Sequence, residues 1–531
     1  MNDGHSLSRR RILSWIGKTA GASAMYQAMN SLAFASESNY DSNFSLDGGN
    51  SKTKIIILGA GLAGMTAAHE LKKAGYSVKV LEYRPIAGGR CWTLRGGEQF
   101  SELGGEIQSC NFDPGLYFNP GPWRIPYHHH AVLGYCKEFG VKLEPFVQVN
   151  HNARLHSSMA FGGKPQSIRV VQADLHGNIS ELLSKCIDQR RLNDELTVED
   201  REKLLEVLRS WGGLDRNGEY KKSLESSLRR GFLIDAGGGS MPLPTYSETL
   251  DRGELLKSGL WRFLLDGGSY EFQPTLFQPV GGMDMLARAF SKKLAGSIEY
   301  NACVKNIHQS AEGVKISWQN VNDPSSIQTE SADWCICTLP LSILNKIPSN
   351  FSARMTSAIH AIPYAASVKI GLQFKRRFWE SDDHIYGGIS YTDLPISKIS
   401  YPSNDYGSSG KGVLLGGYIW GPNAYEFSAM SAEQRIKSAL HYGSQLHSQY
   451  QQEFDSGISV SWHRNPWTNG CYAQWTNELR AAHYDAMCEI DNRIVLAGEH
   501  VSYIPAWQEG AILSALDAIK RLHNRIINRA L

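Results

Sequence analysis

The sequence predicts a mixed α/β protein, with α/β and α+β parts, and three observations support this fold class. Residues 55–82 read as a strand, a glycine turn, a helix and a second strand in immediate succession. A strand and a helix close the chain at residues 493–526, and strand patterns with glycine-rich turns fill residues 368–450. Residues 192–227 are instead charged and helix-forming. We therefore expect a parallel sheet with covering helices, a mixed sheet and a helical insertion.

The first element is a Rossmann-like βαβ unit. The apolar strand 55–58 leads into residues 59–64, whose sequence GAGLAG matches G-x-G-x-x-G. These glycines allow a tight turn and bring a pyrophosphate close to the N-terminus of the following helix. Glu82 follows the second strand, where a carboxylate can bind ribose hydroxyls. A glycine-rich turn without a ligand is the alternative. The expected dinucleotide contacts are Gly59, Gly61, Leu62, Ala63, Gly64, Glu82, Tyr83 and Arg84.

A second glycine cluster distinguishes between the common dinucleotides. Residues 88–90 read Gly-Gly-Arg, and residues 103–106 read Leu-Gly-Gly-Glu. A nicotinamide-binding fold does not need this second cluster, so the sequence favours FAD. No second G-x-G-x-x-G follows downstream. A separate nicotinamide domain is therefore not expected, and the flavin should be reoxidised by something other than a bound pyridine nucleotide.

The N-terminus resembles a twin-arginine export signal. Residues 8–13 read Ser-Arg-Arg-Arg-Ile-Leu and precede a modestly apolar stretch, and residues 33–35 form an A-x-A cleavage site. This route exports folded proteins, which suits a protein that loads its cofactor before export. We expect a periplasmic or secreted protein. A basic leader without an export function is the alternative.

Length and composition exclude several other classes. The 531 residues suffice for two or three domains. The net charge is +2, and removal of residues 1–35 leaves about −1, so nothing indicates nucleic acid. No later stretch approaches the roughly 18 apolar residues of a membrane span. Nine cysteines without a C-x-x-C pair argue against a zinc site or a disulfide scaffold, and Cys335 and Cys337 are expected to pack in a core.

The dinucleotide domain is expected to be discontinuous, because its last strand and helix come from the C-terminus. The predicted boundaries are a signal peptide at 1–35, a linker at 36–53, FAD-binding segments at 54–118, 269–345 and 471–531, substrate-domain segments at 119–165 and 346–470, and a helical insertion at 166–268.

Further motifs carry a family resemblance. Residues 279–283 read Pro-Val-Gly-Gly-Met and residues 338–341 read Thr-Leu-Pro-Leu. Residues 497–499 and 506–510 read Ala-Gly-Glu and Ala-Trp-Gln-Glu-Gly. With these motifs the chain resembles the flavin-containing amine oxidases, and within them the L-amino acid oxidases, over nearly all its mature length. The resemblance implies FAD as a non-covalent cofactor.

The resemblance also implies cofactor roles beyond the first turn. The Gly-Gly-Arg segment would lie along the diphosphate, and the Leu-Gly-Gly turn beside the flavin. Val304 would contact the adenine through its backbone, and Glu499 would reach the ribityl or diphosphate region. Trp507 would stand against the flavin as one wall of an aromatic cage. The implied contacts are Gly88, Gly89, Arg90, Trp123, Arg124, Val304, Gly498, Glu499 and Trp507.

Residues 121–126 indicate the amino acid oxidase subgroup. They read Gly-Pro-Trp-Arg-Ile-Pro, which is similar to a G-P-M-R-x-P element whose arginine clamps the substrate carboxylate. A guanidinium suits that role because it is planar, stays protonated and binds carboxylates bidentately. A surface arginine that caps the following helix is the alternative for Arg124. Residues 418–420 are similar to the family's Y-x-W, in which Tyr418 is a second carboxylate donor and Trp420, like Trp507, contacts the substrate.

Lys369 is the third predicted catalytic residue, with Arg124 and Tyr418. Alternation in residues 368–374 places Val, Ile, Leu and Phe on one face of a strand and Lys369 on the other. The resemblance implies that this lysine reaches flavin N5 through a water and stabilises superoxide during reoxidation. A solvated strand lysine is the alternative.

Two further motifs invite other chemistry. Residues 469–472 read Asn-Gly-Cys-Tyr, which is similar to an element that bonds covalently to the flavin in some monoamine oxidases. Non-covalent relatives keep a similar sequence, so Cys471 is expected to be a packed thiol. Residues 128–130 are three histidines, but adjacent residues on a helix point about 100° apart, so no metal site is expected.

These expectations combine into oxidative deamination. An L-amino acid would bind with its carboxylate on Arg124 and Tyr418, and its α-hydrogen would leave as hydride to the flavin. The imino acid would hydrolyse to a 2-oxo acid and ammonia, and oxygen would become hydrogen peroxide. The alternatives are a decarboxylating, amide-forming flavin monooxygenase, an amine or polyamine oxidase, and a non-enzymatic flavoprotein. The expected partners are a small L-amino acid, oxygen and a second copy of the chain in a homodimer.

The sequence does not determine which side chain the substrate carries. Four acidic residues could select lysine or arginine, and a solvated loop is the alternative explanation for each. They are Asp235, Glu248, Asp251 and Glu254.

Overall fold

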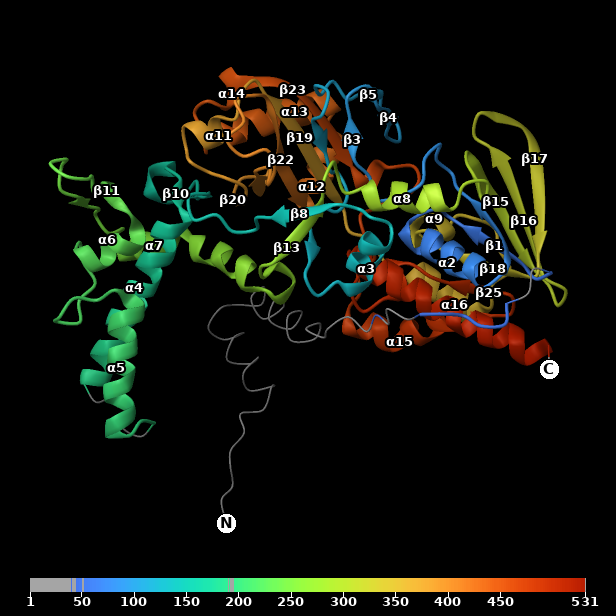
Figure 1. Ribbon diagram of the computed structural model, residues 1–531, viewed down its shortest axis with the longest axis horizontal. Coiled ribbons are helices and arrows are strands. Elements are labelled where there is room, and N and C mark those ends of the chain that lie inside the picture. Colours follow the sequence, from blue (N-terminus) through green and yellow to red (C-terminus); the bar gives the residue numbers. More distant parts are fainter. Residues whose placement is uncertain (1–39, 41–43, 50–51, 190, 192–194, 531) are drawn as a thin grey trace, which may run out of the picture.

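The fold consists of three regions arranged along the long axis of the molecule (Figure 1). This computed structural model describes residues 40, 44–49, 52–189, 191 and 195–530. A helical segment forms one end, a mixed sheet lies in the middle, and a parallel sheet with covering helices forms the end that holds the C-terminus. The fold class is mixed α/β, which confirms the prediction. The proposed export signal lies outside the described residues.

The parallel sheet is assembled from segments that are far apart in the sequence. All neighbouring strands run parallel except the last pair. Ile55 and Ile57 pack on the side of helices α2 (Leu62–Lys73) and α16 (Gln508–Ala530), whereas Ile56 packs on the opposite side. Burial on both faces explains the continuous apolar run of the first strand. The strand order is β14 (Ile298–Glu299), β2 (Ser77–Leu81), β1 (Lys54–Leu58), β18 (Trp334–Cys337), β25 (Ile494–Leu496) and β24 (Ile490–Asp491).

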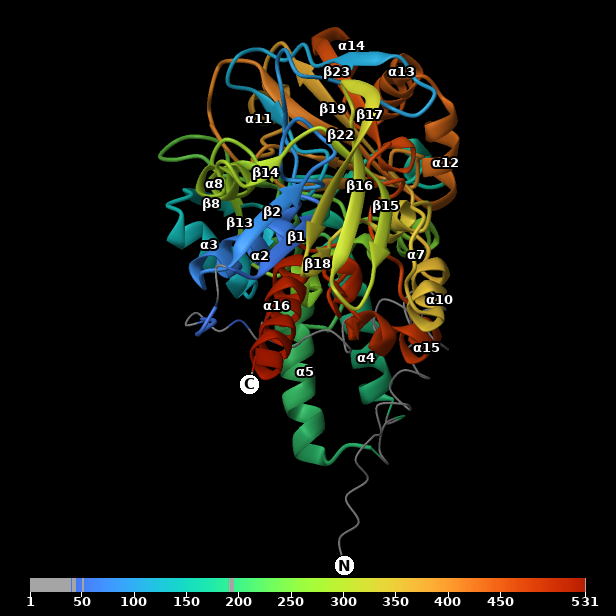
Figure 2. The ribbon, with the colours of Figure 1, turned by 90° about the vertical axis from the view of Figure 1, so that its right-hand side faces the viewer.

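An antiparallel ribbon stands beside this sheet (Figures 1 and 2). It contains β15 (Ala302–Gln309), β16 (Val314–Asn320) and β17 (Asp323–Ala332). Buried and more exposed residues alternate in β16, and apolar side chains of β15 and β16 join a core with β18. Strand β17 was not predicted, because most of its residues are exposed and polar and give no hydrophobic period.

The first turn requires glycine at two positions. Gly59 follows β1 with a φ of +97°, a conformation that glycine adopts without strain. A Cβ at Gly64 would collide with the carbonyl oxygen of Gly59. Helix α2 can therefore begin directly after the strand, with Met65 N donating to Gly61 O at 2.9 Å.

The mixed sheet forms the largest hydrophobic core. All eight residues of its strand β19 (Ser367–Phe374) are buried, and Lys369 is paired with Tyr418 on the neighbouring strand. The sheet is antiparallel except for the pair β20 and β9. The strand order is β10 (Gln166–Ser167), β9 (Arg154–His156), β20 (Ile389–Thr392), β21 (Lys398–Ser400), β22 (Gly412–Trp420), β19 and β23 (Phe454–Ser461). The helices α11 (Phe378–Ser381), α12 (Gly421–Ala429), α13 (Ala432–Gly443) and α14 (Tyr450–Glu453) lie between its strands in the chain.

The helical segment projects from the mixed sheet, and α5 extends away from both sheets (Figures 1 and 2). A buried ion pair between Asp174 and Arg230 ties its first helix to its third. The elements are α4 (Ile168–Asp188), α5 (Val198–Gly212), α6 (Leu224–Arg230), β11 (Phe232–Ile234), β12 (Thr245–Tyr246), α7 (Arg252–Ser258), η2 (Leu260–Gly268) and η3 (Tyr270–Phe272).

A small three-stranded sheet connects the three regions. Its central strand β13 (Leu276–Pro279) follows η3, and its outer strands are β7 (Ile125–Pro126) and β8 (Leu143–Phe146). Helix α3 (His130–Glu138) lies between the outer strands in the chain. In the part of the chain that the structure describes, no helix is long and apolar enough to cross a membrane. The remaining elements are β3 (Leu94–Arg95), β4 (Gln99–Ser101), β5 (Ile107–Ser109), β6 (Tyr117–Phe118), η1 (Phe161–Gly163), α8 (Met285–Lys293), α9 (Leu341–Leu344), α10 (Ala353–Ala361), η4 (Trp462–Arg464), α15 (Asn477–Cys488) and η5 (Glu499–Val501).

Candidate active site

A cavity of about 190 Å³ lies at the carboxyl ends of the parallel strands. Residues at the ends of four of these strands line it: Gly59, Glu82 and Thr338 directly follow β1, β2 and β18, and Gly498 lies two residues after β25. This is the edge of an open α/β sheet at which ligands bind. The predicted residues that line the cavity are Gly59, Gly61, Leu62, Ala63, Glu82, Tyr83, Gly88, Gly89, Arg90, Tyr418, Trp420, Gly498, Glu499 and Trp507.

The glycine turns leave room for a pyrophosphate. A Cβ at Gly61 would meet no other atom within 4 Å, so this backbone faces the cavity openly. Gly88 and Gly89 have φ values of +117° and +54°, and Gly88 pairs with Gly61 in an isolated bridge. The two glycine clusters therefore lie side by side in the cavity wall, here called the double glycine cradle. A side chain at Gly61 would narrow the space that they leave. This arrangement fits a dinucleotide diphosphate.

Glu82 has the position and acceptor capacity for a ribose. Its carboxylate accepts the N–H groups of Ala60 at 2.6 Å and Arg84 at 2.9 Å. A carboxylate has about four acceptor sites, so sites remain for two hydroxyls. Burial raises the pKa of Glu82, and the two backbone donors oppose this shift.

The arginines beside the cavity already have protein partners. Arg90 donates to Glu499 at 2.7 Å and to the carbonyl of Cys471 at 2.8 Å. Burial opposes its charge, but Glu499 outweighs burial and raises the pKa of Arg90. Arg84 lies 4.7 Å from the ring of Trp92, is similarly stacked on Trp467, and donates to Gly89 O at 3.1 Å. Arg84 thus stabilises the turn at Gly89 without lining the cavity itself.

Four aromatic side chains, here called the aromatic cage, line the same cavity: Tyr418, Trp420, Tyr472 and Trp507. Tyr418 and Trp420 project from one face at the end of β22, with ring centroids 4.7 Å apart, and Trp420 lies 5.8 Å from Tyr472. The neighbouring Cys471 is also in the wall, and burial raises the pKa of its thiol. A protonated thiol is a poor nucleophile, so this environment does not promote a bond to the flavin.

Arg124 is a partly buried cation next to the cage. Its guanidinium lies 4.2 Å from the ring of Phe272, 4.9 Å from Trp123 and 5.8 Å from Trp507. Its Nε is buried without a hydrogen-bond partner, and no carboxylate among the described residues forms an ion pair with it. Burial lowers the pKa of Arg124, but an arginine remains protonated at neutral pH. It directly precedes β7, so the alternative of a helix-capping surface arginine is wrong.

Lys369 is a second buried cation, 2% exposed. Its Nζ donates to the carbonyls of Gly121 and, at 3.4 Å, Asn119, and it lies 4.6 Å from the ring of Trp123 and 4.4 Å from that of Tyr418. Burial lowers its pKa to about 7. The alternative of a solvated strand lysine is therefore wrong.

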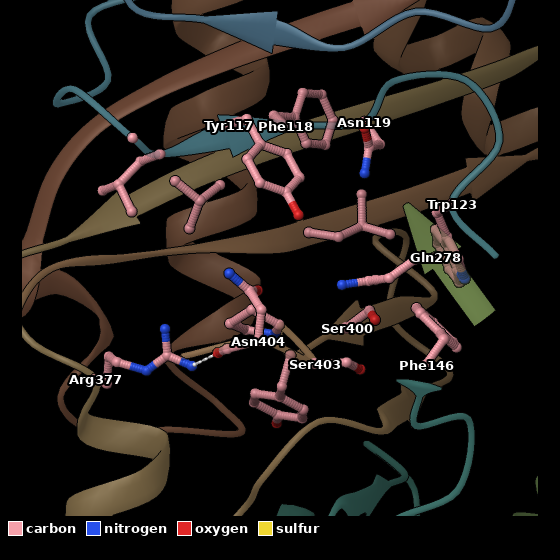
Figure 3. Close-up of a pocket in the computed structure, with 16 residues that line it drawn as sticks. Tyr117, Phe118, Asn119, Trp123, Phe146, Gln278, Arg377, Ser400, Ser403 and Asn404 are labelled. Carbon is pink, nitrogen blue, oxygen red and sulfur yellow. Dashed lines mark hydrogen bonds between the residues drawn. The ribbon is translucent and has the colours of Figure 1, made fainter. Parts of the chain in front are cut away.

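A second cavity, of about 80 Å³, lies on the other side of loop 119–123 (Figure 3). Asn119 and Trp123 line this cavity, whereas the intervening residues 120–122 line the first. The ends of Tyr117, Gln278 and Asn404 point into the space. Trp123 therefore separates the second cavity from Arg124, and it is not a wall of the first.

Several predicted residues do not line the first cavity. Gly64 packs beneath the turn, and Val304 lies in β15 opposite Trp318. The four acidic candidates for substrate selection lie in the helical segment and do not contact Arg124: Asp235 is exposed, Glu248 pairs with Lys222, Asp251 caps α7, and Glu254 accepts from Phe161 N. Two other acidic residues act electrostatically on Arg124, Asp266 and Glu271. Sequence reasoning missed them, and it missed Phe272 and Tyr472.

The expectation for the three histidines is corrected in one respect. It placed residues 128–130 together on a helix, but α3 begins at His130. His128 and His129 precede the helix, and their Nε2 atoms lie 3.1 and 3.2 Å from Oε2 of Glu271. The argument from helical spacing is therefore wrong.

Comparisons with known proteins agree with this site. The sequence pattern of the family described as flavin containing amine oxidoreductase matches residues 62–522. A Bacillus subtilis (strain 168) protein named "Putative L-amino-acid oxidase YobN" is 30% identical over 87% of this chain and 93% of its own length. An L-amino-acid oxidase of Siganus canaliculatus is 28% identical over 90% and 86%. Wild-type putrescine oxidase bound to putrescine has a similar fold, with a TM-score of 0.57 at 16% identity over 91% of this chain and all of that chain.

The parallel sheet, the double glycine cradle and the aromatic cage define a flavoprotein oxidoreductase. The chain belongs to the flavin-containing amine oxidoreductase family, and FAD is its cofactor. It acts on amines or amino acids.

Proposed function

We propose that the protein oxidatively deaminates L-amino acids. The reaction converts an L-amino acid, oxygen and water into a 2-oxo acid, ammonia and hydrogen peroxide. One observation carries the proposal: Arg124, beside the cavity for FAD, lacks a carboxylate partner among the described residues. The names of the related L-amino-acid oxidases support it.

The unpaired guanidinium of Arg124 supports a substrate that carries a carboxylate. An arginine surrounded by aromatic rings has lost part of its hydration, and a buried charge without a counter-ion costs several kcal/mol. A substrate carboxylate would offset that cost through a bidentate contact. A simple amine could not, because it would place a second positive charge beside Arg124.

The cage completes the binding site. Burial raises the pKa of Tyr418 well above its usual value, so its hydroxyl stays protonated and can donate to a carboxylate. Trp420, Tyr472 and Trp507 exclude water and favour a substrate whose amine is neutral. These residues orient the substrate, and no acid–base pair of the protein is needed.

FAD supplies the redox chemistry when it is bound, since it accepts the two electrons and the hydrogen of the substrate and passes electrons to oxygen. Lys369 adds a charge that the pH can switch. Its pKa of about 7 allows both the protonated and the neutral form near neutral pH. The carbonyls of Asn119 and Gly121 hold its ammonium group in place.

A substrate panel tests the proposal. Purified FAD-loaded protein is incubated with L- and D-amino acids and with putrescine and benzylamine, and peroxide, ammonia and 2-oxo acid are quantified. Catalase is added to the 2-oxo acid assay, because peroxide decarboxylates the product. We expect equimolar products from L-amino acids only.

The same panel separates the alternatives. A carboxamide with one carbon fewer than the substrate would identify the decarboxylating monooxygenase. Faster oxidation of amines than of any amino acid would identify an amine oxidase. Absence of peroxide with every compound would leave a non-enzymatic flavoprotein.

A further inference from the structure

Three side chains converge beside the aromatic rings that surround Arg124. The Nε2 atoms of His128 and His129 lie 3.1 and 3.2 Å from one oxygen, Oε2 of Glu271. The imidazole rings are nearly perpendicular, at 87°, with centroids 4.9 Å apart. Both histidines are buried, with 3% and 2% exposure. The cluster therefore presents two ring nitrogens and a carboxylate to one point.

The surrounding structure holds this arrangement in place. His129 has φ −83° and ψ 72°, which is not helical, so its side chain does not follow the helical spacing of α3. Tyr270 stacks on His128 with centroids 4.1 Å apart, and Trp507 meets His129 edge-on at 5.0 Å.

We propose that His128, His129 and Glu271 bind a divalent transition-metal ion of the Zn²⁺ type. Two imidazoles and one carboxylate are an established zinc donor set, with water as the fourth ligand. Tetrahedral bonds of about 2.0–2.1 Å place ligand atoms about 3.3–3.4 Å apart. The observed separations of 3.1 and 3.2 Å need only small outward shifts to admit the ion.

The expected affinity is moderate. Each metal-bound imidazole carries its proton on Nδ1, and tight sites provide an acceptor for that N–H. His128 Nδ1 is buried without a partner within the described chain. The site should therefore exchange its ion rather than retain it through purification in chelator.

Metal binding at this position should affect the wall beside Arg124. Glu271 and Phe272 are adjacent in η3, and Phe272 covers the guanidinium of Arg124. An ion would join η3 to the segment before α3 and, through His129, to Trp507. Metal binding should stabilise this wall by mass action. The metal proposal does not depend on which substrate is oxidised.

A second group of possible ligands provides an internal control. His69, Glu70 and Glu138 also lie close together, but they offer a single imidazole. Glu70 is already bonded to Lys73 at 2.9 Å and to Tyr135 at 2.8 Å. We assign no metal to this group.

Cobalt provides the direct test. Tag-free, FAD-loaded protein is dialysed against chelator and titrated with Co²⁺, whose tetrahedral d–d bands absorb at longer wavelengths than oxidised flavin. We expect one equivalent of Co²⁺ to bind and Zn²⁺ to displace it. His129→Gln and Glu271→Gln should weaken binding by more than about tenfold. His130→Gln, at the adjacent exposed position, and His69→Gln should bind as the unmodified protein does.

The outcomes that overturn the proposal are distinct. They are the absence of stoichiometric Co²⁺ binding, binding that survives both Gln substitutions, or binding lost in His69→Gln. Flavin absorbance and melting temperature show that each variant is folded. X-ray absorption of the unmodified Zn²⁺ form decides independently of any substitution: two imidazole ligands support the site, and one or none contradicts it.

Discussion

The two cavities on either side of loop 119–123 each adjoin an arginine, and only one of these arginines has a carboxylate partner among the described residues. In the second cavity Arg377 donates to Glu380 at 2.7 Å and to the carbonyl of Asn404 at 2.8 Å, and both charged side chains are 4% exposed (Figure 3). Beside the first cavity, Arg124 faces aromatic rings and has no carboxylate among the described residues. A cation that the fold already neutralises contributes to stability, whereas one that it leaves unpaired indicates a ligand.

Arg377→Met should have the largest effect, and it should fall on stability. Removal of the guanidinium leaves the carboxylate of Glu380 buried without its partner, which typically costs about 3–5 kcal/mol. The free energy of unfolding, measured by denaturant titration of the FAD-loaded protein, should fall by that amount. The value of kcat/KM for the folded fraction should stay within about threefold. A large loss of kcat/KM at unchanged stability would show that the second cavity takes part in the reaction.

Arg124→Met should show the reverse pattern. A substrate carboxylate left without its partner costs about 2–5 kcal/mol in transition-state binding. At roughly 1.4 kcal/mol per factor of ten, kcat/KM should fall by about 30-fold to several thousandfold. Stability should not fall as it does in Arg377→Met, because the substitution breaks no ion pair and removes a partly desolvated charge. A loss below threefold with every L-amino acid would place the carboxylate elsewhere.

Lys369→Met should slow reoxidation of the flavin by oxygen and leave its reduction by substrate nearly unchanged. The role predicted for Lys369 is a preorganised charge near the flavin, which would assist electron transfer to oxygen more than hydride departure from a neutral amine. Stopped-flow absorbance should show anaerobic reduction by substrate within about tenfold of the unmodified protein and reoxidation slowed by roughly a hundredfold. Slower reduction with normal reoxidation would make Lys369 a substrate-binding or structural residue.

The contiguous parts of the site could be predicted from the sequence. The turn at 59–64 and Glu82 reach one cavity because they directly follow β1 and β2, and the Gly-Gly-Arg segment joins them from the loop after β2, where Gly88 pairs with Gly61. The resemblance grouped Lys369 with Tyr418, and the two are paired residues on adjacent strands with the ammonium 4.4 Å from the ring. Their catalytic roles stay predictions.

The remainder of the site could not be predicted, because it depends on irregular turns and long-range packing. Asp266 lies in the 3-10 helix η2, and Glu271 and Phe272 lie in η3, a single 3-10 turn that is too short to show a hydrophobic period. The start of α3 was missed because His129 occupies the N-cap without a side-chain capping bond, so no Ser, Thr, Asp or Asn marks the boundary. Strand β19 is buried on both faces, so Lys369 is buried too, although the alternation of apolar residues indicates only one buried face.

The pH dependence of reoxidation should give a smaller effect, of roughly tenfold. The pKa of Lys369 is lowered from 10.5 to about 7 by burial, so the helpful charge is lost as the pH rises through 7. The reoxidation rate should therefore fall over that range, and Lys369→Met should abolish the change. Stability should move in the opposite direction: above pH 7 the unfolded chain holds the proton that the folded chain has released, so the free energy of unfolding rises with pH until about 10. A reoxidation rate that is flat in the unmodified protein would contradict this assignment.

The smallest predicted effect concerns the side chain of the substrate. The acidic residues near Arg124 already have partners, because Asp266 pairs with Lys398 at 2.7 Å and Glu271 lies within hydrogen-bond distance of the two histidines. A lysine or arginine substrate would find aromatic walls and, in the described part of the chain, no unpartnered carboxylate near Arg124, so kcat/KM should favour leucine or phenylalanine by about tenfold, or roughly 1.4 kcal/mol. Lys398→Met frees Asp266 and should move the ratio toward lysine by several-fold, with Lys375→Met, a lysine outside both cavities, as the control. If lysine is already the preferred substrate and Lys398→Met leaves the ratio of kcat/KM values unchanged, a group other than Asp266 determines the preference for the substrate side chain.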